Sequence, residues 1–274
     1  MDGVIAVDLY AVQYLLEALG PVEVPGYGVS IGGSNALETL WEGYRRDPGF
    51  LPALTSAVAG RLQQPDLLHP ERLPALLEAL GRSLEEKHIL LYFNDPALQA
   101  AVVRAGWSGA LRDDPGDFLM VVDSDFSYAE VNRFIEQEMA YRVVLDHDLK
   151  VRQSTVVLTY RNHFDRWSSA ETREQFGGAC FDPQTEDLEV SPGCYGDYIR
   201  LYLPRGSRFL QAQGFDDGME YREENNRTCI AGYLRVLPGE ERTVSVTYAP
   251  PAGPLGGQYR LTWQKQPGTA ALPV

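Results

Sequence analysis

Apolar residues recur at helical spacing through most of residues 1–112. A short strand at Val4–Val7 comes first, and the segment after Asp8 then places leucines on one helical face until Gly20-Pro21 ends it. The same spacing predicts four further helices, which begin near Ser34, Asp47, Pro70 and Asp95, and a buried strand at His88–Phe93. We therefore predict a mostly helical α/β domain over residues 1–112.

The second half of the chain changes to the alternating pattern of half-buried strands. Tyr141–Leu145 and Val151–Tyr160 flank a turn and predict a hairpin. Further strands are predicted at 118–122, 198–203, 208–213, 228–236, 242–248 and 258–264. About six or seven turn-separated strands are typical of an antiparallel, immunoglobulin-like sandwich. We place this domain at residues 118–268, after a polar linker at 112–117.

The first strand follows the start of the sequence almost directly. A buried apolar strand normally has neighbours on both sides. We therefore expect the chain to be the later part of a larger, membrane-anchored protein. The other strands of its first sheet would precede this segment, so that the N-terminal domain is incomplete.

Composition excludes some classes of function. Hydrophobic residues make up 44% of the 274 residues, which is typical of a globular protein. A formal net charge of -14, without basic clusters, argues against nucleic acid as a partner. No window approaches the roughly 18 to 20 apolar residues of a membrane span, and the start does not resemble a signal peptide.

The three cysteines all lie in the second half, at Cys180, Cys194 and Cys229. Their spacing does not predict a zinc site. Cys180 and Cys194 flank an acidic loop, and a disulfide between them would restrain that loop. The alternative is that all three are ordinary thiols.

Motifs for nucleophilic catalysis, zinc hydrolysis and nucleotide binding are missing, so we predict no catalytic residue, cofactor or metal ion. The histidines are scattered, at positions 69, 88, 147 and 163. Carboxylates gather at Asp123 and Asp125, at Asp146 and Asp148, and from Asp216 to Glu224. Such pairs can bind calcium, but solvated turns explain them better because the EF-hand pattern is missing.

Two features leave binding open. Arg45 and Arg46 end a predicted helix, where they could hold a phosphate, although cations are favoured at a helix C-terminus in any case. Tyrosines and tryptophans along the strands could stack on sugar rings, or they could fill the core and form cross-strand pairs.

Several blocks resemble the bacterial domain of unknown function 4012 family, in the expected order along nearly the whole chain. They are Asp2–Asp8, Leu15–Val22, Ser34-Asn35, Lys87–Phe93 with Asp95-Pro96, Gly106-Trp107, Gly116–Asp123 and Gln264–Gly268. The resemblance implies an extracytoplasmic envelope protein whose membrane anchor precedes this segment. The strand, helix and turn over Val4–Val22 are also similar to LytR-CpsA-Psr phosphotransferases, which transfer glycopolymers from polyprenyl-pyrophosphate donors. In that family most of the pyrophosphate-binding residues precede this block, and Arg45 and Arg46 alone would correspond to a later arginine-bearing segment.

Three functions follow as hypotheses. The first is a non-catalytic envelope module for scaffolding or recognition at the cell surface, with a cell-wall glycopolymer or another envelope protein as partner. The second is part of a LytR-CpsA-Psr-like phosphotransferase. The third is a glycan-binding module that uses the aromatic residues of the sandwich.

Overall fold

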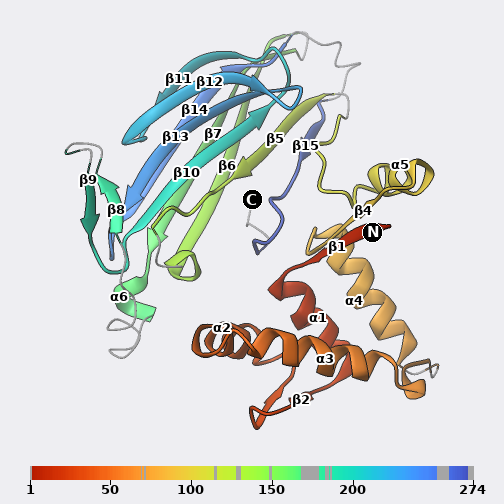
Figure 1. Cartoon of the computed structure of the whole chain (residues 1–274). Coiled ribbons are helices and arrows are strands. Elements are labelled where there is room, and N and C mark those ends of the chain that lie inside the picture. The colour runs from red at the N-terminus through yellow and green to blue at the C-terminus, as the bar shows by residue number, and fades with distance from the viewer. Residues whose placement is uncertain are drawn as a thin grey trace. The chain divides into compact units, whose positions relative to one another are not determined.

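The computed structural model describes residues 2–68, 70, 72–113, 116–127, 131–147, 150–167, 179–182, 185, 187–251 and 259–270. The chain divides into two compact units (Figure 1). Unit 1 comprises Met1–Arg112 together with Pro267–Ala270, and unit 2 begins at Asp113 and runs to Gln266.

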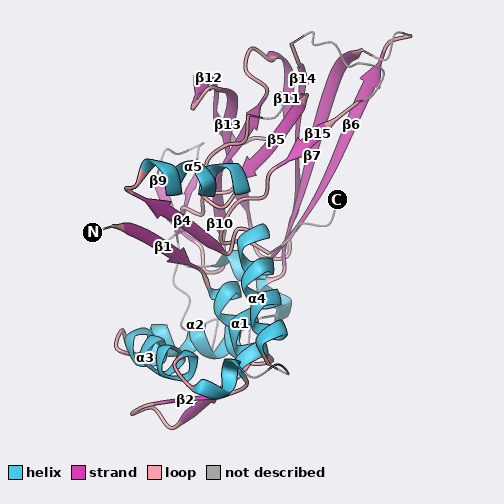
Figure 2. Ribbon diagram, turned by 90° about the vertical axis from the view of Figure 1, so that its right-hand side faces the viewer, coloured by secondary structure: helices cyan, strands magenta, loops and turns pink. Residues whose placement is uncertain are grey.

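Unit 1 contains the longer helices (Figure 2). They are α1 (Leu9–Leu19), α2 (Ala36–Arg46), α3 (Phe50–Leu62), α4 (Leu73–Glu85) and α5 (Pro96–Ala105), with a 3-10 turn at Pro65–Leu68. Asp8 caps α1, because its Oδ1 accepts the N–H of Ala11 at 2.9 Å. Asp95 caps α5 in the same way, with Pro96 at the first helical position. The capping signals in the sequence are confirmed for these two helices.

The strands of unit 1 form two separate antiparallel pairs. β1 (Gly3–Val7) pairs with β4 (Ile89–Phe93), and β2 (Val22–Val24) pairs with β3 (Val29–Ile31). The apolar core lies between α1, α2, α3 and the β2–β3 hairpin. Its fully buried members include Leu16, Ile31, Leu40 and Phe50.

Unit 2 is built from two sheets. The five-stranded sheet has the order β12 (Asp217–Glu224), β13 (Arg227–Val236), β10 (Tyr195–Leu203), β5 (Asp117–Val122) and β15 (Leu261–Trp263). The four-stranded sheet has the order β11 (Arg208–Gln213), β14 (Glu241–Ala249), β7 (Val151–Asn162) and β6 (Ile135–Leu145). A small pair, β8 (Ala179–Asp182) with β9 (Asp187–Val190), a 3-10 turn at Val131–Phe134 and the short helix α6 (Phe164–Trp167) complete the described elements.

The two large sheets pack against each other and bury a shared core (Figure 1). Leu158 and Val246 of the four-stranded sheet and Ile199 and Leu201 of the five-stranded sheet are fully buried. The alternating burial along β7 follows the apolar–polar alternation of its sequence. The predicted hairpin is confirmed as the antiparallel β6–β7 pair.

The fold class predicted from sequence, a mostly helical, incomplete LytR-CpsA-Psr-like α/β domain followed by an immunoglobulin-like sandwich, is wrong. The residues that the structure describes are about 29% helical and 41% strand, so the chain is not mostly helical. Unit 1 joins its helices to isolated antiparallel strand pairs, whereas an α/β domain needs a central parallel sheet. The sandwich is not purely antiparallel either, because β15 runs parallel to β5.

The first strand also differs from the prediction. Within the described residues β1 belongs to a two-stranded sheet with β4, and it is not buried. Val4, Ile5 and Val7 are 49%, 64% and 50% exposed. Valine and isoleucine favour an extended chain whether or not a second neighbour covers it, so the apolar run predicted the strand but not its burial.

Candidate functional site

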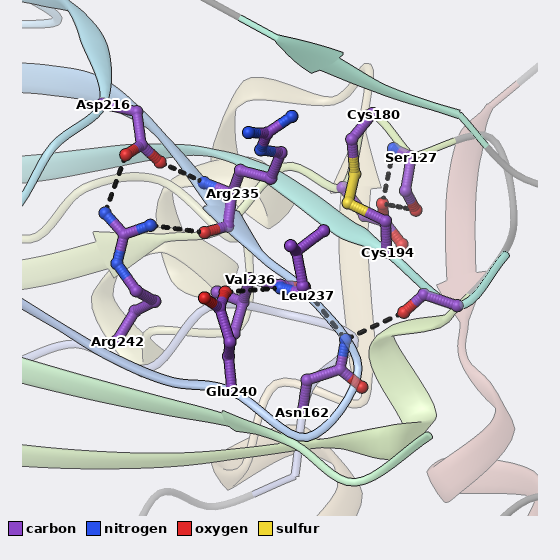
Figure 3. The surroundings of a disulfide bond; sticks show 12 residues. Ser127, Asn162, Cys180, Cys194, Asp216, Arg235, Val236, Leu237, Glu240 and Arg242 are labelled. Carbon is purple, nitrogen blue, oxygen red and sulfur yellow. Dashed lines mark hydrogen bonds and ion pairs between the residues drawn. A yellow bond between two sulfur atoms is a disulfide. The ribbon is translucent and has the colours of Figure 1, made fainter. Parts of the chain in front are cut away.

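One end of the sandwich is closed by a disulfide bond. Cys180 of β8 and Cys194, which directly precedes β10, are joined with a Cα–Cα distance of 6.1 Å (Figure 3). Both cysteines are completely buried. The third cysteine, Cys229 of β13, is a buried free thiol whose pKa is raised chiefly by burial. The structure therefore brings together the two cysteines that flank the acidic loop.

Asn162, at the end of β7, ties the two sheets together beside this disulfide. Its Nδ2 donates to the carbonyl oxygens of Gly193 at 2.8 Å and Val236 at 3.0 Å (Figure 3). Its Oδ1 accepts the N–H of Phe164 at 3.0 Å. Because Gly193 adjoins Cys194, a buried amide side chain and a covalent bond restrain the same turn.

A second crosslink joins β13 and β14. Arg242 Nη2 donates to Asp216 Oδ1 at 2.7 Å, and Arg242 Nη1 donates to the carbonyl oxygen of Arg235 at 3.0 Å. The N–H of Arg235 in turn donates to Asp216 Oδ2 at 2.7 Å (Figure 3). Each partner thus makes at least two contacts, which fixes the geometry of the group more firmly than a single surface ion pair would.

An open cleft of about 570 Å³ lies beside Asn162, and we refer to it as the β7-end cleft. It is lined by Arg161, Asn162, His163, Asp165, Gly239, Glu240 and Glu241. Glu241 Oε2 contacts Arg161 Nε at 2.5 Å, and Glu138 Oε1 contacts Arg161 Nη1 at 2.9 Å. Glu136 Oε2 lies 3.7 Å from the same guanidinium group. Since three carboxylates already pair with the arginine, this surface favours neutral or cationic groups over phosphate.

The histidines occupy different surroundings. His163 Nε2 lies 2.8 Å from Glu136 Oε2 at the β7-end cleft. In unit 1, His88 Nδ1 lies 2.7 Å from Asp8 Oδ2, and Nε2 is 3.4 Å from Glu86 Oε2. His147 lies in the turn after β6, and His69 lies outside the described residues. The contacts of His88 and His163 given above are thus with carboxylates.

The acidic turns predicted from the sequence contain local hydrogen bonds. Asp125 Oδ1 accepts the N–H of Ser127 at 2.8 Å, and Asp146 Oδ1 accepts the N–H of Lys150 at 2.9 Å. Asp148 lies outside the described residues. Within the described part of the chain, no group of three or more histidine, cysteine or acidic side chains is arranged to hold a metal ion.

Arg45 and Arg46 lie in the last turn of α2. The guanidinium of Arg45 stacks over the ring of Trp41, 4.8 Å from its centroid. Arg46 pairs with Glu42 at 3.6 Å, and the Arg46 side chain is 79% exposed. Each arginine thus contacts a residue four positions earlier on its own helix. The helix C-terminus they occupy carries partial negative charge, which opposes binding of an anion.

A buried carboxylate, Asp117 of β5, accepts from hydroxyl groups of the four-stranded sheet and from Tyr259, which lies just before β15. Its Oδ2 accepts from Tyr141 at 2.5 Å and Tyr259 at 2.9 Å, and from Ser154 at 3.1 Å. Its Oδ1 accepts from Tyr248 at 3.1 Å. Burial is the main cause that raises the pKa values of Tyr141, Tyr248 and Tyr259, and the neighbouring carboxylate adds to it.

Two more acidic residues, Asp123 and Asp197, lie close together between the sheets. Asp123 directly follows β5, and its Oδ1 accepts the Tyr160 hydroxyl at 2.6 Å. Gln137 Nε2 donates to Asp123 Oδ2 at 3.0 Å. Asp197 of β10 is fully buried, and its Oδ1 accepts the N–H of Ser124 at 2.6 Å. Burial raises the pKa of both carboxyl groups, and for Asp197 the charge of Asp123 raises it further.

Sequence reasoning missed Asn162, Asp117 and Asp197. Each had one signal, which is a polar residue at an otherwise apolar or inward-facing position of a strand. Asp197 is the clearest case, because it lies within Tyr195–Leu203, where most residues are buried.

The comparison with protein families covers the start of the chain. A family model described as "Protein of unknown function (DUF4012)" matches residues 1–44, which include β1, α1, the β2–β3 hairpin and most of α2. The sequence blocks after residue 44 lie outside this match, and it does not extend to the similarity with LytR-CpsA-Psr phosphotransferases. No curated protein matches the chain. None of the helices in the described residues combines the length and apolarity that a bilayer crossing requires.

Proposed function

We propose that this chain is a non-catalytic, extracytoplasmic module of the bacterial cell envelope that acts in scaffolding or recognition. The observation that carries the proposal is the Cys180–Cys194 disulfide. Disulfides persist in oxidising compartments and are rare in the cytoplasm, where thiols are kept reduced. The similarity of residues 1–44 to a family of unknown function is compatible with this role but supplies no mechanism.

The buried polar side chains that could in principle take part in catalysis support a structural role instead. Asn162, Asp117 and the Asp216–Arg242 pair each hold strands together. A catalytic carboxylate or amide needs room for substrate beside it, whereas Asp117 is only 4% exposed and Asn162 is 1% exposed. The β7-end cleft is open, and its carboxylates suit recognition of a neutral or cationic group of a partner.

The location can be tested in the producing cells by two-step thiol alkylation. Intact cells are treated with a membrane-impermeant alkylating reagent, then denatured with a second, isotope-labelled reagent without reductant. We expect Cys180 and Cys194 to react with neither reagent, and Cys229 to take the second reagent on denaturation. Alkylation of Cys180 and Cys194 without prior reduction contradicts an extracytoplasmic location.

The non-catalytic part needs a separate experiment. The purified chain is incubated with polyprenyl-pyrophosphate-linked glycopolymer and cell-wall acceptor, with a LytR-CpsA-Psr enzyme as the positive control. We expect no transfer by the chain alone. Transfer that is lost in an Arg45→Ala, Arg46→Ala double variant overturns the proposal in favour of a phosphotransferase.

Glycan recognition is a second candidate, and one exposed aromatic residue favours it. Phe126 is 52% exposed, and its ring meets that of Tyr198 edge to face, with centroids 6.5 Å apart. Aromatic rings of this kind can stack on the apolar face of a sugar. A bacterial glycan array tests this: binding should weaken in Phe126→Ala but not in Tyr221→Ala, whose ring is equally exposed on β12. An array without hits contradicts glycan recognition but leaves the scaffolding role intact.

A further inference from the structure

Asp123 and Asp197 are held together by the register of neighbouring strands. β10 runs antiparallel to β5, with Arg200 opposite Val122, and beyond the end of β5 Asp197 forms a bridge with Asp125. Asp123 is therefore a diagonal neighbour of Asp197 on one face of the sheet, a position from which side chains reach each other. The bond from Ser124 N–H to Asp197 Oδ1 turns the buried carboxyl group toward this same strand end.

The hydrogen bonds around the pair are unequal. Both oxygens of Asp123 accept from donors of the opposite sheet, namely Tyr160 of β7 and Gln137 of β6. Asp197 Oδ2 is buried, and no donor among the described residues reaches it with hydrogen-bond geometry. A buried oxygen without a donor is costly, and two ionised carboxylates in contact are costlier.

We propose that Asp123 and Asp197 share one proton, and that this proton joins the ends of β5 and β10 in acidic surroundings and is released as the surroundings become alkaline. The shared proton supplies the donor that Asp197 Oδ2 lacks. It also removes one negative charge from a seam to which β5, β6, β7 and β10 all contribute. Loss of the proton leaves two adjacent charges, of which Asp197 is fully buried and Asp123 half-buried, and weakens this end of the sandwich.

A bound cation would be the other way to join two carboxylates, but the surrounding groups favour a proton. The hydroxyl of Tyr160 and the amide of Gln137 donate to Asp123, whereas a cation requires additional acceptor oxygens. No cluster of three acidic, histidine or cysteine side chains that could hold a metal ion occurs in the described regions.

The other groups facing the pair do not neutralise it. Tyr160 and Tyr195 have pKa values well above the usual range, chiefly because they are buried, so both remain uncharged. The Tyr195 hydroxyl lies beside the Asp197 carboxyl group and opposes the rise in its pKa, but burial and the charge of Asp123 outweigh it. Asp125 carries a further carboxylate beside the strand end, where it accepts from Ser127. Arg200, the nearby cation of β10, donates to Ser124 Oγ at 3.2 Å rather than to either carboxyl group. Because side chains alternate between the two faces along a strand, Arg200 lies on the opposite face of the sheet from Asp197.

The sign of the pH effect follows from the direction of the shifts. Burial, and for Asp197 also the charge of Asp123, raises the pKa of each carboxyl group above its value in the unfolded chain. The folded state then binds more protons than the unfolded state. The stabilisation is fully present below the unfolded value of about 3.9 and is lost as the pH rises through the raised folded value.

The test compares the full chain with Asp197→Asn by hydrogen exchange of peptides from β10 and β5 at about pH 5 and about pH 8. The amide of asparagine can donate permanently to Asp123, so it replaces the shared proton at every pH. At about pH 8 we expect the variant to exchange at least about tenfold more slowly than wild type, which is the equivalent of one pKa unit. At about pH 5 we expect the two proteins to exchange at the same rate. Asp217→Asn, an exposed position on β12, is the matched control and should change neither rate.

A direct measurement keeps the proposal testable if the variant is perturbed. Carboxyl-carbon NMR titration of the wild-type chain should show that one proton remains on the pair after the exposed aspartates have ionised. The proposal is overturned if both groups ionise with the exposed aspartates. It is overturned equally if a correctly folded Asp197→Asn shows the same difference from wild type at both pH values.

Discussion

Buried polar side chains in unit 2 lie where the two sheets face each other. Asp117 gathers hydroxyl groups, Asn162 joins two backbone carbonyls, and Asp123 accepts from Tyr160 and Gln137. A buried polar group that lacks a partner costs more than a satisfied bond contributes. These contacts therefore discourage other alignments of the sheets, because a slip of either sheet would leave several groups unsatisfied.

Truncation of Asn162 measures this effect. Asn162→Ala leaves the carbonyls of Gly193 and Val236 and the N–H of Phe164 without their partner. We expect it to lower the free energy of unfolding of unit 2 by about 3 kcal/mol. The free energy of unfolding is measured by urea unfolding, with hydrogen exchange of β7 and β13 peptides as the readout for unit 2. Gln211→Ala, at an exposed position of β11, is the control and should stay within about 0.5 kcal/mol of wild type.

Gly193 and Gly206 form a matched pair for a second test at this scale. Both have φ of 77°, but a Cβ at Gly193 would collide with the Phe164 ring, whereas one at Gly206 would meet nothing within 4 Å. Gly206→Ala should cost about 1 kcal/mol for the left-handed backbone. Gly193→Ala should cost at least about 2 kcal/mol more, because the ring must move. If urea unfolding shows that both variants lose the same free energy of unfolding, the contact with Phe164 does not affect stability.

At the scale of elements, the disulfide joins β8 to the start of β10 across 14 positions. Reduction should lower the free energy of unfolding of unit 2 by about 3 kcal/mol, because the unfolded chain regains the freedom of that loop. The measurement is urea unfolding with and without reductant. A Cys180→Ala, Cys194→Ala variant serves as control, since reductant should leave its unfolding unchanged. A reductant effect that persists in this variant must come from another source.

Local elements could be predicted from the sequence more reliably than their partners. The helices capped by Asp8 and Asp95 and the β6–β7 hairpin depend on neighbouring residues, and those predictions are confirmed. The strand order of the larger sheet could not be predicted, because alternation identifies which face is buried but not which distant strand lies alongside. The parallel β5–β15 pair joins residues far apart in the chain, as does the bond from Tyr259 to Asp117. The Asp123–Asp197 pair could not be found for the same reason.

For the molecule as a whole, buried tyrosines govern the response to alkali. Tyr141, Tyr160 and Tyr248 have pKa values raised above the usual value of about 10, chiefly by burial. The folded state therefore holds more protons than the unfolded state above about pH 10, and stability falls as the pH rises from there. In ultraviolet titration we expect these tyrosines to ionise together with loss of the β-sheet circular dichroism signal. Ionisation of all fifteen tyrosines while that signal persists would contradict the coupling between tyrosine ionisation and unfolding.

The β1–β4 ribbon has a consequence for handling the protein. β1 carries no charged residue, and its valines and isoleucine face solvent, so it lacks the usual protection of sheet edges against intermolecular pairing. Concentrated samples should therefore slowly form higher-mass species, seeded by strand-to-strand contact. Ile5→Lys should suppress this in light scattering, whereas Ile5→Val should not. If the lysine variant aggregates as fast as wild type, a surface other than β1 mediates the self-association.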